Sequence, residues 1–218
     1  MKRSLLLLPL LLTTACNGLM KTQDNSDNTI SDPMLAYKDF YFSGEYVYYT
    51  DAAVLTDCAT GQILPIASTG DNLNAERRYT AMAGDDMQPC YATLEGYLRP
   101  RESETENSST ELVITHFGRF DPTRQCNPQQ RLTGRYVGSS ADTATQRIIL
   151  ELHSDYSYKQ TTHNIATDSY HVTEGYWGRL SKSVMVIMLP EGNDLLATID
   201  WQGPRLIFSG NSIYTKTH

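Results

Sequence analysis

The sequence predicts an all-β protein made of two small barrels behind a short leader. Runs of aromatic and β-branched residues recur from residue 40 to the C-terminus, with Gly, Pro, Asn and Asp turn signals between them. Only residues 71–83 combine a capping residue with helical spacing of apolar side chains. The leader itself is basic, then apolar, and ends in a cysteine.

The leader predicts export. Lys2 and Arg3 precede the apolar segment Leu5–Leu12, which is too short to span a bilayer. Small residues then lead into Cys16, so residues 1–15 resemble a bacterial lipoprotein signal peptide, with Thr in place of the usual Leu three residues before the cysteine. The resemblance implies that Cys16 carries acyl chains such as palmitate; the alternative is an ordinary cleaved signal. Asn17 replaces the Asp that retains enterobacterial lipoproteins at the inner membrane, which favours the outer membrane, facing the periplasm or the cell surface.

Composition excludes some partners. Removing Lys2 and Arg3 with the leader changes the net charge from −7 to −9. Nucleic-acid binding depends on clustered Lys and Arg, so we expect no nucleic-acid partner. Residues 16–36 are polar, without apolar periodicity, and are predicted to be a flexible tether.

Residues 37–126 predict an OB-like five-stranded barrel with one short helix. Gly44 interrupts the aromatic first strand, which predicts a bulge or bend there. The helix should bury Leu73, Ala75, Tyr79 and Met82. Three strands, a helix and two strands follow one another in the order of an OB fold. The predicted strands cover residues 40–50, 53–58, 62–67, 90–98 and 111–118.

Residues 120–130 contain two prolines and no periodicity, so we place the domain boundary there. Residues 131–218 then read as one short strand after another, which predicts an antiparallel meander that curls or closes into a small barrel. The predicted strands cover residues 135–138, 145–153, 155–162, 170–180, 183–189, 195–201 and 205–208.

The cysteines are the main candidates for chemistry. Exported proteins fold in an oxidising compartment, so one disulfide is expected among Cys58, Cys90 and Cys126. In a barrel, Cys58 at a strand corner and Cys126 after the last strand could meet. A disulfide between them would close a loop and stabilise the folded state by about 4 kcal/mol. Cys90 is then either a buried thiol or a competitor for either partner.

Other site types find little support. The sequence has no close-spaced Cys or His pair for a metal and no GxSxG nucleophile, so we expect neither an enzyme nor a cofactor. His163 and His171, with Met185 or Met188, would make a copper-like set only if they converged. Ordinary strand positions are the simpler explanation.

Several ordered motifs resemble the OB-fold domain of NlpE-type lipoproteins. They are Asp51-Ala52-Ala53, Thr56-Asp57-Cys58-Ala59-Thr60-Gly61, Pro65-Ile66-Ala67, Thr93-Leu94-Glu95-Gly96, Glu111-Leu112-Val113-Ile114 and Cys126. The resemblance implies that Cys58 and Cys126 form a disulfide, as the two cysteines of that domain do.

The second half resembles, more weakly, the lipocalin-like barrel of the same family. The matching motifs are Tyr136-Val137-Gly138, Asp155-Tyr156-Ser157-Tyr158 and Gly175-Tyr176-Trp177. Two departures stand out: the barrels occur in swapped order, and the family's copper-linked CADC loop is replaced by residues 140–143, where Ser140 and Thr143 have no thiol. Hydroxyls are poor ligands for Cu(I), which argues against copper binding by this loop.

The resemblance implies an outer-membrane lipoprotein, held to the membrane by its lipid anchor, that senses envelope stress and signals to a sensor kinase, with a link to copper homeostasis. Two alternatives remain from other classes. One is a small-molecule or peptide binding module with a cavity lined by Tyr156, Tyr158, Trp177 and Trp201. The other is a structural or inhibitory surface lipoprotein.

Overall fold

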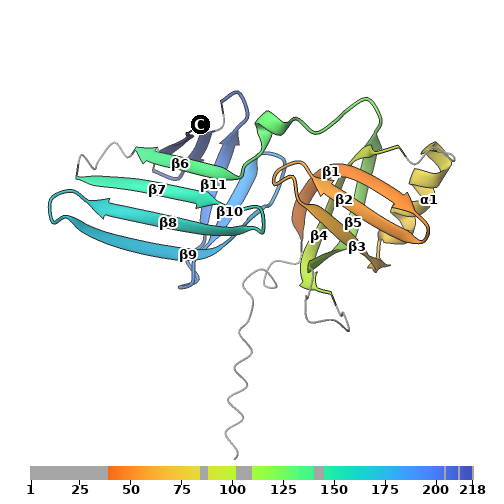
Figure 1. Cartoon of the computed structure of the whole chain (residues 1–218), viewed down its shortest axis with the longest axis horizontal. Helices are drawn as coiled ribbons and strands as arrows, with labels where there is room; N and C mark the ends of the chain where they lie inside the picture. The colour runs from red at the N-terminus through yellow and green to blue at the C-terminus, as the bar shows by residue number, and fades with distance from the viewer. Residues whose placement is uncertain are drawn as a thin grey trace, which may run out of the picture. The chain divides into compact units, whose positions relative to one another are not determined.

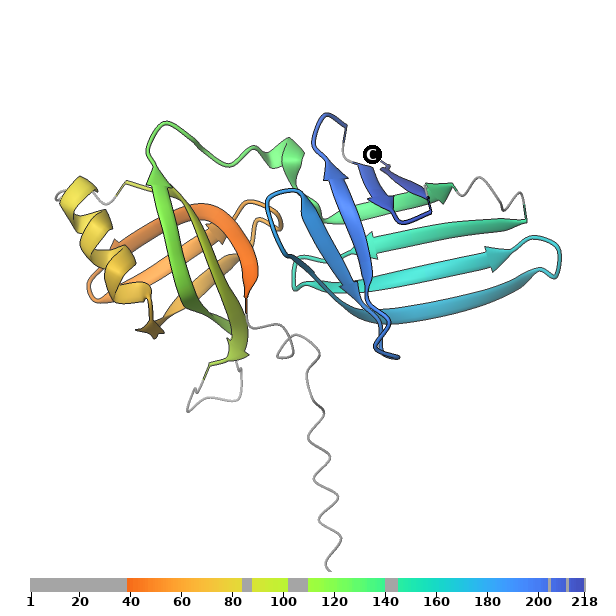
Figure 2. The ribbon, with the colours of Figure 1, turned by 180° about the vertical axis from the view of Figure 1, so that it is seen from behind.

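The structure is a computed structural model that describes residues 39–83, 88–101, 110–139, 145–203, 205–210 and 212–217. These residues form one compact unit. Strands dominate it, as the ribbon in Figures 1 and 2 shows. Cys16, the tether, Ser140 and Thr143 lie outside the described residues. Within the described part, no helix has the length and apolar character needed to cross a membrane.

The first barrel is closed by five strands in the spatial order β1-β2-β3-β5-β4, which confirms the predicted OB-like barrel. Strands β3 and β5 run parallel, and the other neighbouring strands run antiparallel. Its elements are β1 (Phe40–Tyr49), β2 (Ala52–Asp57), β3 (Ile63–Gly70), α1 (Asn72–Ala83), β4 (Cys90–Pro100) and β5 (Thr110–Asp121).

The second barrel is closed by eight antiparallel strands, as the meander predicted. Its last strand was not predicted, and it closes the barrel by pairing Tyr214 with Gly138 of the first strand. A short 3-10 helix, η2 (Pro128–Gln130), precedes the first strand of this barrel. Its strands are β6 (Gly134–Ser139), β7 (Gln146–Leu152), β8 (Ser157–Asn164), β9 (Ser169–Arg179), β10 (Val184–Met188), β11 (Leu195–Asp200), β12 (Arg205–Phe208) and β13 (Ile213–Lys216).

Two local predictions in the first barrel need correction. Helix α1 buries Ala75 and Tyr79 as expected, but Leu73 and Met82 are exposed. At Gly44 no register shift occurs; a side chain there would meet the Thr56 carbonyl oxygen, with the Cβ only 2.3 Å from it. The irregularities lie instead between β4 and β5, and between β3 and β5.

Candidate functional site

The β2–β3 turn is built around the side chain of Asp57. The Asp57 carbonyl accepts the Gly61 N–H at 2.6 Å, and Gly61 takes the positive φ of 77° that the turn requires. The Asp57 carboxylate accepts the Thr60 N–H and the Thr60 hydroxyl, each at 3.1 Å. Local bonds of this type are why Asp and Thr favour turns. These bonds fix the position of the Asp57 carboxylate without any contribution from the second barrel.

Cys58 and Cys126 form a disulfide with their Cα atoms 5.1 Å apart. The bond joins this turn to the segment that follows β5, 68 residues later. The Cys58 N–H donates to the Ser43 carbonyl at 2.9 Å, and the Cys126 N–H donates to the Glu45 carboxylate at 3.2 Å. Both cysteines are half-buried. Of the alternatives open for Cys90, the structure has the buried free thiol, and burial raises its pKa.

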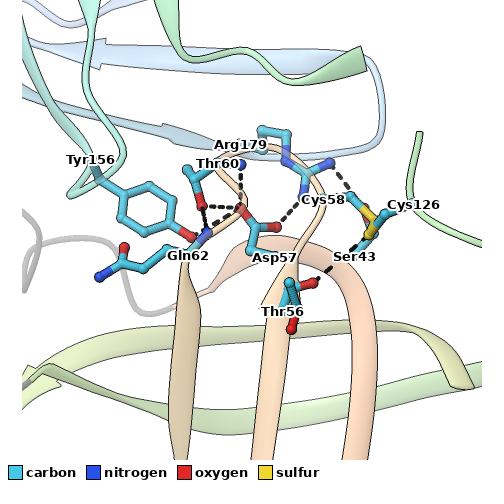
Figure 3. A network of polar contacts seen from close by, with 9 residues as sticks. All are labelled: Ser43, Thr56, Asp57, Cys58, Thr60, Gln62, Cys126, Tyr156 and Arg179. Atoms are coloured by element: carbon cyan, nitrogen blue, oxygen red, sulfur yellow. Dashed lines mark hydrogen bonds and ion pairs between the residues drawn. A yellow bond between two sulfur atoms is a disulfide. The ribbon is translucent and has the colours of Figure 1, made fainter. Parts of the chain in front are cut away.

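Arg179, at the end of β9 in the second barrel, forms an ion pair with Asp57. Its guanidinium Nη2 lies 3.1 Å from Asp57 Oδ1, and Nη1 donates to the Ser43 hydroxyl at 3.1 Å (Figure 3). The Arg179 and Asp57 side chains are only 5% and 1% exposed. Both charged groups of such a buried pair lose their hydration. The stability of the pair therefore depends on its geometry and on further hydrogen bonds.

Tyr156 supplies one of those bonds. It lies in the turn after β7, where its hydroxyl donates to Asp57 Oδ2 at 3.0 Å. Its ring packs 5.4 Å from Trp177 and 6.1 Å from Phe42 of the first barrel. Burial raises the pKa of this phenol well above its usual value, and the Asp57 carboxylate raises it further. Tyr156 therefore remains a protonated donor.

The backbone of Tyr156 is unusual for its residue type. Its φ is 67°, in the left-handed region that glycine favours. A bulky residue there costs of order 1–3 kcal/mol unless its surroundings compensate. A glycine would adopt this conformation without strain, but it has no side chain. The side chain that the turn would otherwise lack is the one that reaches Asp57.

Close packing reinforces the polar contacts. Gly178 lies against the Phe40 ring so closely that an added Cβ would be 2.4 Å from a ring carbon. The Leu132 N–H donates to the Ala59 carbonyl at 2.7 Å. We call the set Ser43, Asp57, Thr60, Tyr156 and Arg179 the Asp57 network. It lies next to the disulfide in sequence, because Asp57 precedes Cys58.

The Asp57 network is suited to mechanical coupling. One carboxylate receives two donors from its own turn and two from the second barrel. A movement of the Cys58 turn would therefore change the environment of Arg179 and Tyr156. Sequence reasoning missed Arg179. The available signal was a cation at the end of a strand, immediately after the aromatic and glycine run Gly175-Tyr176-Trp177-Gly178.

The other candidates do not converge. His163 bonds to Asp168 at 2.9 Å and stacks on Tyr170. Met185 and Met188 are buried in the core. Within the described ranges, no three His, Cys, Asp or Glu side chains are grouped for a metal ion.

The predicted aromatic cavity is not formed by its four residues together. Tyr156, Tyr158 and Trp177 are core side chains with exposed fractions of 4%, 2% and 0%. Trp201 instead lines a separate cavity beside Cys58. Tyr158 lines a different, open pocket with His153 and Glu174, so the four residues share no cavity.

Residues 36–127 match the family model of the NlpE C-terminal OB domain. The first barrel is thus similar to the NlpE C-terminal OB domain. Lipoprotein NlpE of Escherichia coli K12 is 32% identical over 85 residues, which cover 38% of this chain and 35% of that protein. A crystal structure of the Cpx pathway activator NlpE from Escherichia coli shares 31% identity, covering 40% of this chain and 43% of that one, with a TM-score of 0.35.

The matched NlpE segment contains Asp57, Cys58 and Cys126 but ends before β6, so it includes neither Tyr156 nor Arg179. The chain spans about a third of the length of the curated relative that it matches. The NlpE-type OB domain thus brings the disulfide, and the second barrel brings the partners of Asp57.

Proposed function

We propose that this chain is an NlpE-type envelope lipoprotein that senses stress through its disulfide. The carrying observation is that Asp57, next to Cys58, is the carboxylate that holds Arg179 and Tyr156. Reduction of the disulfide by a dithiol gives two thiols, and the β2–β3 turn then loses its covalent link to residue 126. The loosened turn weakens its hold on the second barrel.

The membrane anchor belongs to the same proposal. Cys16 carries the lipid, residues 16–36 form the tether, and residues 37–126 and 131–218 form the two domains. The anchor places the protein at the outer membrane, and mistargeting brings its body near the inner membrane, where an envelope-stress sensor kinase is the proposed partner. The matched solved protein is described as a Cpx pathway activator, which supports this direction.

The proposal includes neither an enzymatic activity nor copper binding by the loop at residues 140–143. Ser140 and Thr143 offer hydroxyls, which are poor ligands for a soft metal. It does not include ligand binding in the predicted aromatic cavity either, because Tyr156, Tyr158, Trp177 and Trp201 line no common cavity.

The redox step is tested with oxidised protein, reduced protein and the double variant Cys58→Ser/Cys126→Ser. We expect both altered forms to lose about 4 kcal/mol of unfolding free energy, because the loop constraint is gone. Limited proteolysis should then cut near residues 57–62. Cys90→Ala is the matched control, and its melting should still respond to reductant. Unchanged melting and proteolysis in the double variant would remove the redox step.

The signalling step is tested separately, with an envelope-stress reporter in the native host. Overproduced wild type should raise the reporter, and Asn17→Asp, which favours inner-membrane retention, should raise it further. The double cysteine variant should also exceed wild type. A flat reporter with lipidated protein present would mean that the NlpE-type domain here lacks the signalling role.

A further inference from the structure

A cavity of about 170 Å³ opens beside the disulfide. Cys58, Tyr91 and Arg124 line it from the first barrel and the segment that follows β5. Arg179, Lys182 and Trp201 line it from the second barrel. The cavity therefore exists only where the two halves of the chain meet.

The lining is cationic in a protein of net charge −7. Arg124, Arg179 and Lys182 reach the cavity, and its lining includes neither Asp nor Glu. The charge of Arg179 is neutralised by the buried carboxylate of Asp57. For Arg124 and Lys182, no carboxylate of the described residues lies within ion-pair distance. Asp121 feels the charge of Arg124 from a greater distance, and its pKa is lowered in part for that reason. Two positive charges without a direct ion pair thus lie at one small opening.

The cavity has a fixed framework. The Arg124 guanidinium lies 4.3 Å from the centre of the Tyr91 ring, and this cation–π contact holds it at the edge of the cavity. The Trp201 indole N–H donates to the Lys182 carbonyl at 3.1 Å, which ties the two residues together. Arg179 is nearly fully buried and held by Ser43 and Asp57. The guanidinium groups of Arg124 and Arg179 are thus held before an anion arrives and lose little freedom on binding, whereas only the main chain of Lys182 is held.

Size and charge together define a ligand class. The volume is below the roughly 300–1,000 Å³ of sites for drug-sized ligands. Guanidinium groups suit carboxylate and phosphate oxygens, because their donors match those oxygens in pairs.

We propose that this cavity binds a small oxyanion, a carboxylate or a phosphate, between Arg124 and Lys182. Its walls come from both halves of the chain, so the bound anion stabilises their contact by mass action. The proposal goes beyond the disulfide and its signalling role, and a silent stress reporter would leave it intact.

The probes are inorganic phosphate and propionate, with neutral propionamide and matched ionic strength in chloride as controls. The chain has two tryptophans, so its two indole N–H signals can be followed by NMR. We expect a saturable shift of the Trp201 signal with at least one anion and little shift of the signal from Trp177, whose indole donates to His153. Phosphate alone, propionate alone or both would define the oxyanion.

The decisive variant is Arg124→Ala/Lys182→Ala, with Lys159→Ala/Arg147→Ala as an equal loss of charge elsewhere. The first should weaken binding at least tenfold, and the second should leave it within twofold. Lys182→Glu, at an exposed position, repeats the test without touching the Arg124–Tyr91 contact. The proposal is overturned if neither anion saturates at millimolar concentration, if propionamide binds equally, or if the variants bind like wild type.

Discussion

Strand β9 joins two very different ends of the second barrel. Its first four residues are exposed, and its last three, Trp177, Gly178 and Arg179, are buried. Both ends carry a side-chain contact to a carboxylate and an aromatic contact. At the exposed end, Asp168 pairs with His163 and is 86% exposed. At the other end, the Asp57–Arg179 pair is almost fully buried.

The difference in burial leads us to expect different contributions to stability from the two pairs. An exposed pair is hydrated and screened, and contributes roughly 0–1 kcal/mol. A buried pair cannot lose one member without leaving the other charge in a poorly hydrated environment. The first barrel creates that environment for Arg179. We call residues 177–179, which pack against the first barrel, the docked end of β9. We call the first four residues of β9, with His163 and Asp168, the free end.

The largest expected effect is at Arg179. Arg179→Met leaves the Asp57 carboxylate buried without its cation, so the unfolding free energy should fall by about 3–5 kcal/mol. Asp168→Asn at the free end is the control; it keeps a residue that tolerates the positive φ of 48° and should cost less than about 1 kcal/mol. Urea unfolding measures both. Equal effects would abolish the distinction between the two ends.

Gly178→Ala should rank next. The new methyl group would overlap the Phe40 ring, and overpacking of a core typically costs about 1–3 kcal/mol. Gly203→Ala is matched, because nothing lies within 4 Å of its added Cβ, and it should change thermal stability little. If Gly178→Ala were as stable as wild type, the close approach of β9 to β1 would not be maintained in solution.

Tyr156→Phe removes one of the four donors to Asp57 while keeping the ring. Loss of a hydrogen bond to a buried charged group should cost about 1.5–3 kcal/mol. Tyr170→Phe, on an exposed ring of the free end, should stay within about 0.5 kcal/mol of wild type. A neutral Tyr156→Phe would indicate that Thr60 and Arg179 alone satisfy the carboxylate.

The smallest effect concerns Tyr158, whose buried hydroxyl has no hydrogen-bond partner among the described residues. Tyr158→Phe should be neutral or stabilising by up to about 1 kcal/mol near pH 8, because an unsatisfied polar group is removed. Chemical unfolding at that pH measures it. A clear loss of stability would show that the hydroxyl has a partner.

The same residue gives a pH dependence. Burial, with a smaller contribution from Asp194, raises the pKa of Tyr158 to about 12. A phenol with a raised folded pKa stabilises fully below its unfolded pKa of about 10, and this contribution is lost as the pH rises from there toward 12. Wild type should therefore melt earlier above pH 10, and Tyr158→Phe should lose less stability over that interval. Identical pH profiles would contradict the assignment.

Much of the fold could be predicted from local patterns. The order of strands with a capped helix at residues 71–83 indicated the OB-like barrel, because turn residues and β-favouring runs act over a few residues. Ile213–Lys216 was missed because four residues after a turn carry little periodicity. Its pairing with β6, more than 70 positions earlier, is what makes it a strand.

The candidate site was predictable only in part. The disulfide followed from the exported context and the resemblance, whereas the Asp57–Arg179 pair joins residues 122 positions apart and has no local signature. Similarly, the prediction placed Leu73 on the buried face of the helix, but Leu73 is two residues before Ala75, about 200° around the helix, and it is exposed while Ala75 and Tyr79 face the core.

The sequence by itself therefore determined an acidic, all-β chain with two barrels, a short helix and a cysteine at the β2–β3 corner. These features depend on composition and on neighbours a few residues apart. Only the tertiary structure decided which charges are buried, which tyrosine reaches Asp57 and where uncompensated cations gather. Those outcomes depend on the removal of water by distant segments, and no local pattern in the chain encodes that.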